Sequence, residues 1–143
     1  MNNFTSGAGE ELPVAAIVAG LVILVAIIVA HVFYLLTLQK ALNRCSPELR
    51  TMQPGMVWLM FIPLFNLVWH FFIVLNVAKS LGSEFRKRGI PEDPASSKAL
   101  GLATCILQCC GIIPCIGGIF ALGGLVCWII YWVQIAGYSR KLA

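Results

Sequence analysis

Apolar residues fall into three long uncharged stretches, which cover residues 12–38, 56–78 and 99–136. At about 1.5 Å of rise per helical residue, the first stretch would reach roughly 40 Å, beyond a hydrocarbon core of about 30 Å. It therefore predicts a transmembrane helix over residues 12–44, preceded by a short extramembrane tail over residues 1–11.

The two ends of this first stretch differ in charge. Glu10 and Glu11 precede it, whereas Lys40 and Arg44 follow it. Because an excess of Lys and Arg marks the cytoplasmic side of a membrane protein, we expect the N-terminus to lie outside. Pro13 suits the first helical turn, where its missing N–H needs no partner.

The second stretch is interrupted near its middle. Pro63 removes a backbone donor and disfavours a helical conformation at Ile62, and Asn66 can cap a new helix that starts just after it. Gly89 is a suitable C-terminal cap for that helix. We expect a segment over residues 56–88 that is broken at Pro63–Asn66 and runs into a basic amphipathic helix.

The third stretch is too long for one crossing, because a straight helix of that length would measure roughly 57 Å. The sequence IPCIGG at residues 113–118 supplies a proline and two glycines for a turn. Helices at about 94–112 and 118–138 would then form a transmembrane hairpin over residues 94–138.

The composition agrees with a lipid environment. Hydrophobic residues make up 59% of the chain and charged residues 11%, against about 25% charged residues in soluble domains. The expected fold class is all-α, an integral membrane helical bundle with four apolar helical segments in a single membrane domain over residues 1–143. The net charge of +4 does not indicate nucleic-acid binding, because the basic residues flank the apolar stretches.

The ten basic residues bear on the topology of the second segment. If four segments cross and the N-terminus lies outside, only Lys40, Arg44 and Arg50 are cytoplasmic, against the positive-inside rule. If the second segment enters and returns on one side, all ten are cytoplasmic, as is the C-terminus. We favour this re-entrant arrangement. Four spans with the N-terminus inside are the alternative, because LVWHFFIVLNVA is apolar enough to cross.

The sequence MQPGMVWLMFIPLFNLVWHF resembles a family of bacterial multi-pass membrane proteins of unknown function. That family shows a Pro-Gly turn followed by W-F-x-P-x-x-N-L and a helix. The matching residues here are Pro54, Gly55, Phe61, Pro63, Asn66 and Leu67. The chain departs from the family at Trp69-His70-Phe71, where the family often has Lys-Pro-Tyr. The resemblance implies a bacterial cytoplasmic membrane protein with a re-entrant or interfacial second segment, and it implies little about activity.

Several polar residues lie within the apolar stretches. Those that mark the structural break or could line a polar path are Pro63, Asn66, His70, Asn76 and Gln134. The simpler interpretation is that Asn66 caps the bend and the others hydrogen-bond to neighbours. A third interpretation is haem or pigment binding through His31 and His70, which would require both imidazoles to face each other at one depth.

Five of the six cysteines crowd the last hairpin: Cys105, Cys109, Cys110, Cys115 and Cys127. Their spacing matches no C-x-x-C motif, so we interpret them as small apolar packing residues rather than a metal site. A redox role, or thiolates that hold zinc or an iron–sulfur cluster, is the alternative. Small residues in the same hairpin would let helices approach closely in lipid. Those predicted for helix packing are Gly117, Ala121, Gly123 and Gly124.

The cluster Arg86, Lys87 and Arg88 is interpreted as an orientation signal, with contact to a lipid headgroup or a partner as the alternative. Ser/His/Asp, HExxH and P-loop patterns are all missing from the sequence, so we predict a protein that is not an enzyme and has no cofactor. The lead hypothesis is a scaffold or accessory subunit of a membrane complex. Its expected partners are membrane lipid and other membrane protein subunits or further copies of the chain. The alternative is a small oligomeric pore or carrier that uses Asn66, His70 and Gln134.

Overall fold

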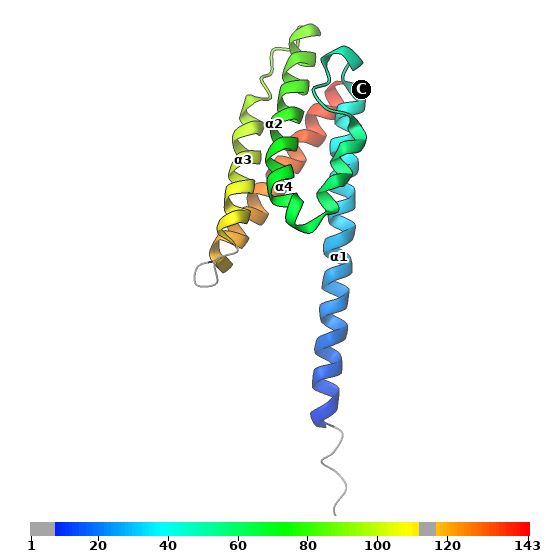
Figure 1. Ribbon diagram of the computed structural model, residues 1–143, viewed down its shortest axis with the longest axis vertical. Coiled ribbons are helices and arrows are strands. Elements are labelled where there is room, and N and C mark those ends of the chain that lie inside the picture. The colour runs from blue at the N-terminus through cyan, green and yellow to red at the C-terminus, as the bar shows by residue number, and fades with distance from the viewer. Residues whose placement is uncertain (1–7, 112–116) are drawn as a thin grey trace, which may run out of the picture. The chain divides into compact units, whose positions relative to one another are not determined.

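The computed structural model describes residues 8–111 and 117–143, and every regular element within these ranges is helical (Figure 1). The elements are α1 (Ala8–Arg44), the 3₁₀ helices η1 (Pro47–Leu49) and η2 (Pro54–Phe61), α2 (Pro63–Lys87), α3 (Ala95–Cys110) and α4 (Gly117–Lys141). Within the described ranges, three helices are long and apolar enough to cross a membrane. The prediction of an all-helical membrane protein is confirmed at this level.

The chain divides into two compact units, Met1–Tyr34 and Leu35–Ala143. The described part of the first unit is the N-terminal portion of α1, a helix with apolar residues around its whole circumference, as expected for a helix in lipid. The predicted start of this helix was wrong. It begins at Ala8, so Pro13 lies inside the helix rather than in its first turn. Alanine and glutamate favour helix here, and negative charge suits a helix N-terminus.

The second unit, residues 35–143, combines the end of α1 with α2, α3 and α4. Helix α4 runs parallel to the end of α1, because Trp132 donates to Thr37 at 2.9 Å and Arg44 donates to Ser139 Oγ at 3.1 Å. The core of this unit is apolar and fully buried. Its largest members include Leu35, Leu38, Leu42, Ile73, Leu81, Phe85, Tyr131 and Ile135.

Helices α2 and α3 are antiparallel and lie close together at a glycine. A Cβ atom added at Gly101 of α3 would lie 2.5 Å from Val74 Cγ1 on α2 and 2.9 Å from the Tyr131 ring on α4. The absence of a side chain at Gly101 therefore lets three helices meet. His70 and Gln108 mark the other end of the α2–α3 contact, with 3.0 Å between His70 Nδ1 and Gln108 Oε1.

The second apolar segment is broken where the sequence predicts. Helix η2 ends at Phe61, Ile62 is extended with φ −81° and ψ 111°, and α2 starts at Pro63. The capping role predicted for Asn66 was wrong, because Ile62 occupies the N-cap position and no side chain caps the helix. Asn66 lies in the first turn, where its N–H donates to Ile62 O at 2.8 Å. Proline is pre-set for the first helical position, so the helix starts at the proline itself.

The C-terminal cap predicted at Gly89 is confirmed. Gly89 has φ +66°, its N–H donates to Arg86 O at 3.2 Å, and Ile90 N–H donates to Phe85 O at 3.0 Å. This pair of bonds is a Schellman motif, which needs a left-handed residue that glycine adopts without strain. Helix α2 therefore ends at Lys87, close to the predicted end.

The predicted terminal hairpin corresponds to α3 and α4. Helix α3 covers Ala95–Cys110, and α4 covers Gly117–Lys141, which is three residues longer at its end than predicted. Most of the IPCIGG turn, including Cys115, lies outside the described residues.

Residues 46–62 run back along α2 in the opposite direction, so residues 46–88 form a hairpin with its apex at Ile62–Pro63. Three hydrogen bonds set the register: Ser46 N–H to Glu84 Oε2 at 2.8 Å, Thr51 N–H to Ser80 Oγ at 3.0 Å, and Trp69 Nε1–H to Met56 O at 2.9 Å. The two ends of the 46–88 hairpin therefore lie side by side, at the end of the second unit where α1 and α4 finish.

Candidate functional site at the polar end of the second unit

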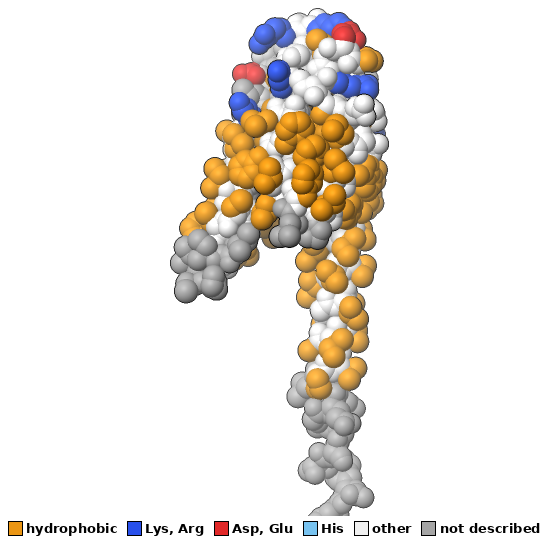
Figure 2. Space-filling model, in the orientation of Figure 1, with side chains coloured by type: hydrophobic (Ala, Val, Ile, Leu, Met, Phe, Trp, Pro, Cys, Tyr) orange, Lys and Arg blue, Asp and Glu red, His pale blue; other side chains and the backbone are white. Residues whose placement is uncertain are grey.

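Charged side chains gather at one end of the second unit. Figure 2 shows Lys, Arg, Asp and Glu side chains clustered there, next to a band of hydrophobic side chains. The C-terminal ends of α1, α2 and α4 lie together at this end. Arg88, just after α2, donates to the carbonyl of Arg44 at the end of α1 and to the carbonyl of Leu142 just after α4. The end is therefore the polar cap of an otherwise apolar bundle.

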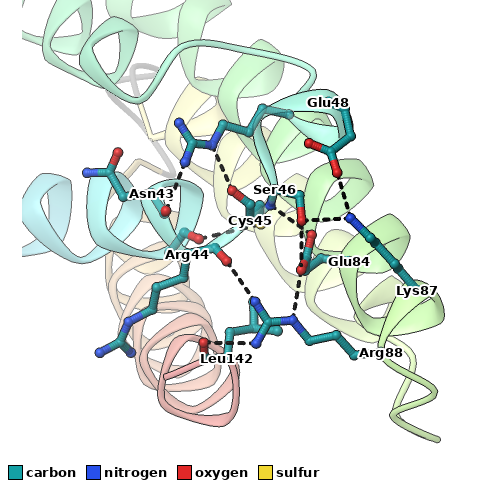
Figure 3. Close-up of polar contacts among 11 residues, drawn as sticks. Asn43, Arg44, Cys45, Ser46, Glu48, Glu84, Lys87, Arg88 and Leu142 are labelled. Carbon is teal, nitrogen blue, oxygen red and sulfur yellow. Dashed lines mark hydrogen bonds and ion pairs between the residues drawn. The ribbon is translucent and has the colours of Figure 1, made fainter.

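A buried carboxylate lies at the centre of this polar end. Glu84 on α2 is 1% exposed, and its carboxylate accepts hydrogen bonds from Ser46 N–H at 2.8 Å, Ser46 Oγ–H at 3.2 Å and Arg88 Nε–H at 2.7 Å (Figure 3). Burying a charge without partners costs several kcal/mol. The three donors compensate for that cost and tie the start of the 46–88 hairpin to its end.

Arg88 extends this network to the other helices. Its Nη1 donates to Leu142 O at 3.1 Å and its Nη2 donates to Arg44 O at 3.2 Å (Figure 3). Three helices that end together present their unpaired carbonyls and negative dipole ends at one place. The guanidinium of Arg88 satisfies two of these carbonyls and adds positive charge among them.

Arg50 and Arg44 likewise donate to backbone carbonyls at the ends of α1 and α4. Arg50 donates to Asn43 O and to Cys45 O, each at 2.9 Å, and Arg44 donates to the carbonyl of Ser139. The polar network is defined here as Glu84 and Ser46 with the three arginines Arg44, Arg50 and Arg88. It connects the ends of α1, α2 and α4 through charge-assisted hydrogen bonds, which are stronger than neutral ones.

Exposed ion pairs surround the polar network. Lys87 Nζ lies 2.6 Å from Glu48 Oε1, with half of the lysine side chain exposed, and Lys141 pairs with Glu92. The hydrogen bond from Lys87 holds the pKa of Glu48 below its ordinary value. Burial, followed by the charge of Glu84, raises the pKa of the Cys45 thiol to about 11, so it stays protonated at neutral pH.

The three residues of the basic cluster, Arg86, Lys87 and Arg88, differ in whether they form ion pairs. Lys87 and Arg88 make internal ion pairs, whereas Arg86 is exposed and makes no ion pair within residues 8–111 and 117–143.

Sequence reasoning missed Glu84 as a central residue. The signal that could have found it is the i, i+4 spacing of Glu84 and Arg88 next to an apolar helix.

The residues predicted to line a polar path differ in their contacts. His70 is 3% exposed and bonds to Gln108 on α3, whereas the Asn76 amide donates to Phe72 O of its own helix at 2.8 Å. His70 and Asn76 therefore engage different neighbours. Within the described ranges, Asn66 Oδ1 and Gln134 Oε1 are buried and accept no hydrogen bond.

The two histidines lie in different units. The His31 ring lies 6.0 Å from the Tyr34 ring within α1, and His70 belongs to the second unit. Haem binding by this pair stays a prediction, and a Soret band in the purified protein would test it. In the part of the chain that the structure describes, no three His, Cys, Asp or Glu side chains are grouped as metal ligands.

Small residues of the last hairpin face α3 within the same chain. A Cβ atom at Gly124 would lie 3.3 Å from Leu107 Cβ, one at Gly123 would lie 3.9 Å from Leu107 Cδ1, and one at Gly117 would meet the carbonyl of Gly111. Ala121, in contrast, is exposed. Among the described cysteines of the hairpin, Cys105 is 2% exposed, Cys110 and Cys127 are partly exposed and Cys109 is exposed, so packing within the chain fits Cys105 best.

Comparison with known protein families, with characterised proteins and with solved structures finds no match. The sequence resemblance at Pro54–Leu67 therefore stays a prediction.

Proposed function

We propose that this protein is a non-enzymatic scaffold or accessory subunit of a bacterial cytoplasmic membrane, built around a re-entrant 46–88 hairpin. The observation that carries the proposal is the bond of 2.8 Å between Ser46 N–H and Glu84 Oε2. If the segment between these residues crossed the membrane, they would lie on opposite sides of a core about 30 Å thick. Their direct contact supports entry and return on one side.

The surroundings of α2 support the same topology. In the most apolar part of α2, 39% of the residues are buried by protein, against 17% in α4. Irregular backbone at membrane depth requires cover by protein, and the extended Ile62 at the apex of this hairpin is 49% exposed. The re-entrant topology therefore also requires another subunit or a further copy of the chain to cover the apex. In the proposed arrangement α1 crosses with its N-terminus outside, α3 and α4 form the transmembrane hairpin, and all ten basic residues are cytoplasmic.

In this topology the short helix α3 must cross the membrane and the longer helix α2 must not. Helix α3 has 16 residues, about 24 Å, whereas the apolar helix within α2 has 23 residues and is long enough to cross. Length alone thus favours α2 as a span. We give more weight to the register of the 46–88 hairpin, because several polar contacts would have to break for α2 to cross separately.

The scaffold role is supported by a broad apolar surface on α4. Ile119 is 80% exposed, Leu122 68% and Val133 65%. In a membrane these side chains face lipid or the helices of another subunit. A protein that stays monomeric in mild detergent and co-purifies with no other membrane protein would contradict the scaffold role.

Topology is tested by single cysteines in a cysteine-free version of the protein. Gln53, Pro91 and Ala143 are exposed positions outside the apolar stretches, and Ser6 in the N-terminal tail serves as the opposite-side control. We expect a membrane-impermeant maleimide to label the first three only from the cytoplasmic side and Ser6→Cys only from outside. Labelling of Gln53→Cys and Pro91→Cys from opposite sides would contradict the re-entrant hairpin.

The second candidate function is a small oligomeric pore or carrier. It is favoured by the buried oxygens Asn66 Oδ1 and Gln134 Oε1, which could bind a solute or water with donor groups. Flux of small solutes into liposomes that is lost in Asn66→Ala and His70→Ala is the expected result for a pore. Flux that both variants leave unchanged would remove this candidate.

A further inference from the structure

A hollow of about 390 Å³ lies between α2 and α3 where the polar end meets the apolar band. It is lined by Leu75, Ala78, Lys79, Asp93 and Lys98. The two lysines are exposed, and neither makes an ion pair within the described residues. They differ in this from Lys87, Arg88 and Lys141, whose charges are used within the chain.

Each lysine stands at the end of an apolar stripe. On α2, Phe72 and Leu75 precede Lys79 at i, i+3 and i+7 spacing, and each of the two apolar side chains is 41% exposed. Residues at this spacing lie on one face of a helix. This face of α2 therefore changes from apolar to positively charged within two turns.

Helix α3 presents a matching stripe. Lys98 is followed at i+4 and i+8 by Leu102 and Ile106, and Ile106 is 54% exposed. Because α2 and α3 are antiparallel, with Val74 next to Gly101, both lysines lie at the same end of their stripes. The hollow therefore brings two ammonium groups together with the apolar side chains of Leu75 and Ala78.

The geometry points to a binding site for an anionic phospholipid in the cytoplasmic leaflet, with the phosphate between Lys79 and Lys98 and an acyl chain along Leu75 and the exposed Ile106. Two ammonium groups outweigh the one carboxylate that lines the hollow, so a negatively charged headgroup is favoured. The start of α3 contributes the positive end of its dipole beside Lys98. This inference rests on the proposed membrane placement but not on the scaffold role.

The test measures lipid retained by the purified full-length protein, with native mass spectrometry from detergent containing phosphatidylglycerol or phosphatidylcholine. The variant is Lys79→Gln/Lys98→Gln. The matched control is Lys40→Gln/Arg140→Gln, which removes the same charge from two exposed residues elsewhere. One charge near a lipid surface is worth about 1 kcal/mol, or about fivefold in affinity, so we expect phosphatidylglycerol binding to fall roughly 25-fold in the variant.

The control double variant should keep its affinity within about twofold, and the unmodified protein should prefer phosphatidylglycerol to phosphatidylcholine. Soluble glycerol phosphate should not displace the lipid, because it lacks the acyl chain that the apolar side chains accept. Equal losses in both double variants, equal binding of both lipids, or displacement by glycerol phosphate would each overturn the site. The labelling pattern at Gln53, Pro91 and Ala143 is a separate readout, so failure of the lipid site and failure of the topology are distinguishable.

Discussion

The two ends of the 46–88 hairpin differ in how far their polar groups are hydrogen-bonded. At the open end, the Glu84 carboxylate and the arginines around it are joined by bonds that connect three helices. At the apex, none of the described side chains caps α2, and none of them donates to the buried Asn66 Oδ1. Polar contacts between helices therefore hold the fold at the open end, whereas a buried acceptor is left over at the apex.

The largest effect is expected from the centre of the polar end. Glu84→Ala leaves Arg88 without its ion-pair partner and removes the acceptor of Ser46 N–H, so the free energy of unfolding should fall by about 3 kcal/mol. Thermal unfolding in detergent measures this loss of stability. Glu48→Ala is the matched control, because that carboxylate is exposed, and its unfolding temperature should stay unchanged. Equal unfolding temperatures for the two variants would show that the open end does not hold the fold.

A smaller effect is expected between the two ends, where α2, α3 and α4 meet. Gly101→Ala places a Cβ atom 2.5 Å from Val74 Cγ1, and the β-branched valine can yield little. We expect a loss of about 2 kcal/mol in the same assay. Gly118→Ala serves as the control, because a Cβ atom there would have no neighbour within 4 Å among the described residues. A Gly101→Ala variant as stable as this control would contradict the close approach of the helices.

The apex should respond in a different way. Asn66→Leu removes a buried oxygen that accepts no bond, so stability should stay within about 1 kcal/mol or increase slightly. His70→Leu leaves Gln108 without its partner and should lose about 1 to 2 kcal/mol. A strong loss in Asn66→Leu alone would mean that its oxygen has a partner in the protein, and the contrast between the two ends would be lost.

The smallest effect concerns the reactivity of Cys45 at the polar end. With a pKa of about 11 instead of 9.0, the thiolate is about one part in a thousand at pH 8. Alkylation by iodoacetamide should be slow in the folded protein and fast in SDS, as seen by mass spectrometry. Because the folded state holds this proton more tightly, its stability contribution is complete below about pH 9 and is lost as the pH rises to about 11. Equal rates in the two conditions would contradict a buried thiol.

Local sequence signals predicted much of the fold. Pro63 located the break, Gly89 located the end of α2, and the apolar stretches located the helices, because each depends on one residue or a short run. The prediction failed where two signals competed. Asn66 is a good cap for a helix that starts at Leu67, but α2 starts four residues earlier at Pro63, and Pro13 is tolerated within α1.

The candidate site was less accessible from sequence. The three residues of the Arg86–Arg88 cluster look equivalent in the sequence, but Arg88 bonds to Glu84, Leu142 and Arg44 while Arg86 makes no ion pair within the described residues. These contacts join residues far apart in the chain, and hydropathy carries no information about them. Charge placement did predict that the two ends of the second segment share one side, and the register of the 46–88 hairpin supports that proposal.

One distance in a lipid bilayer tests the re-entrant hairpin most directly. Spin labels on Pro47→Cys and Arg86→Cys, in a cysteine-free protein in vesicles, report the separation of two exposed positions at the ends of the hairpin. The contacts between Ser46 and Glu84 and between Glu48 and Lys87 predict a label separation below about 20 Å, and the labels should interact. A separation of about 30 Å or more, the thickness of the hydrocarbon core, would mean that the segment crosses the membrane and would contradict the account.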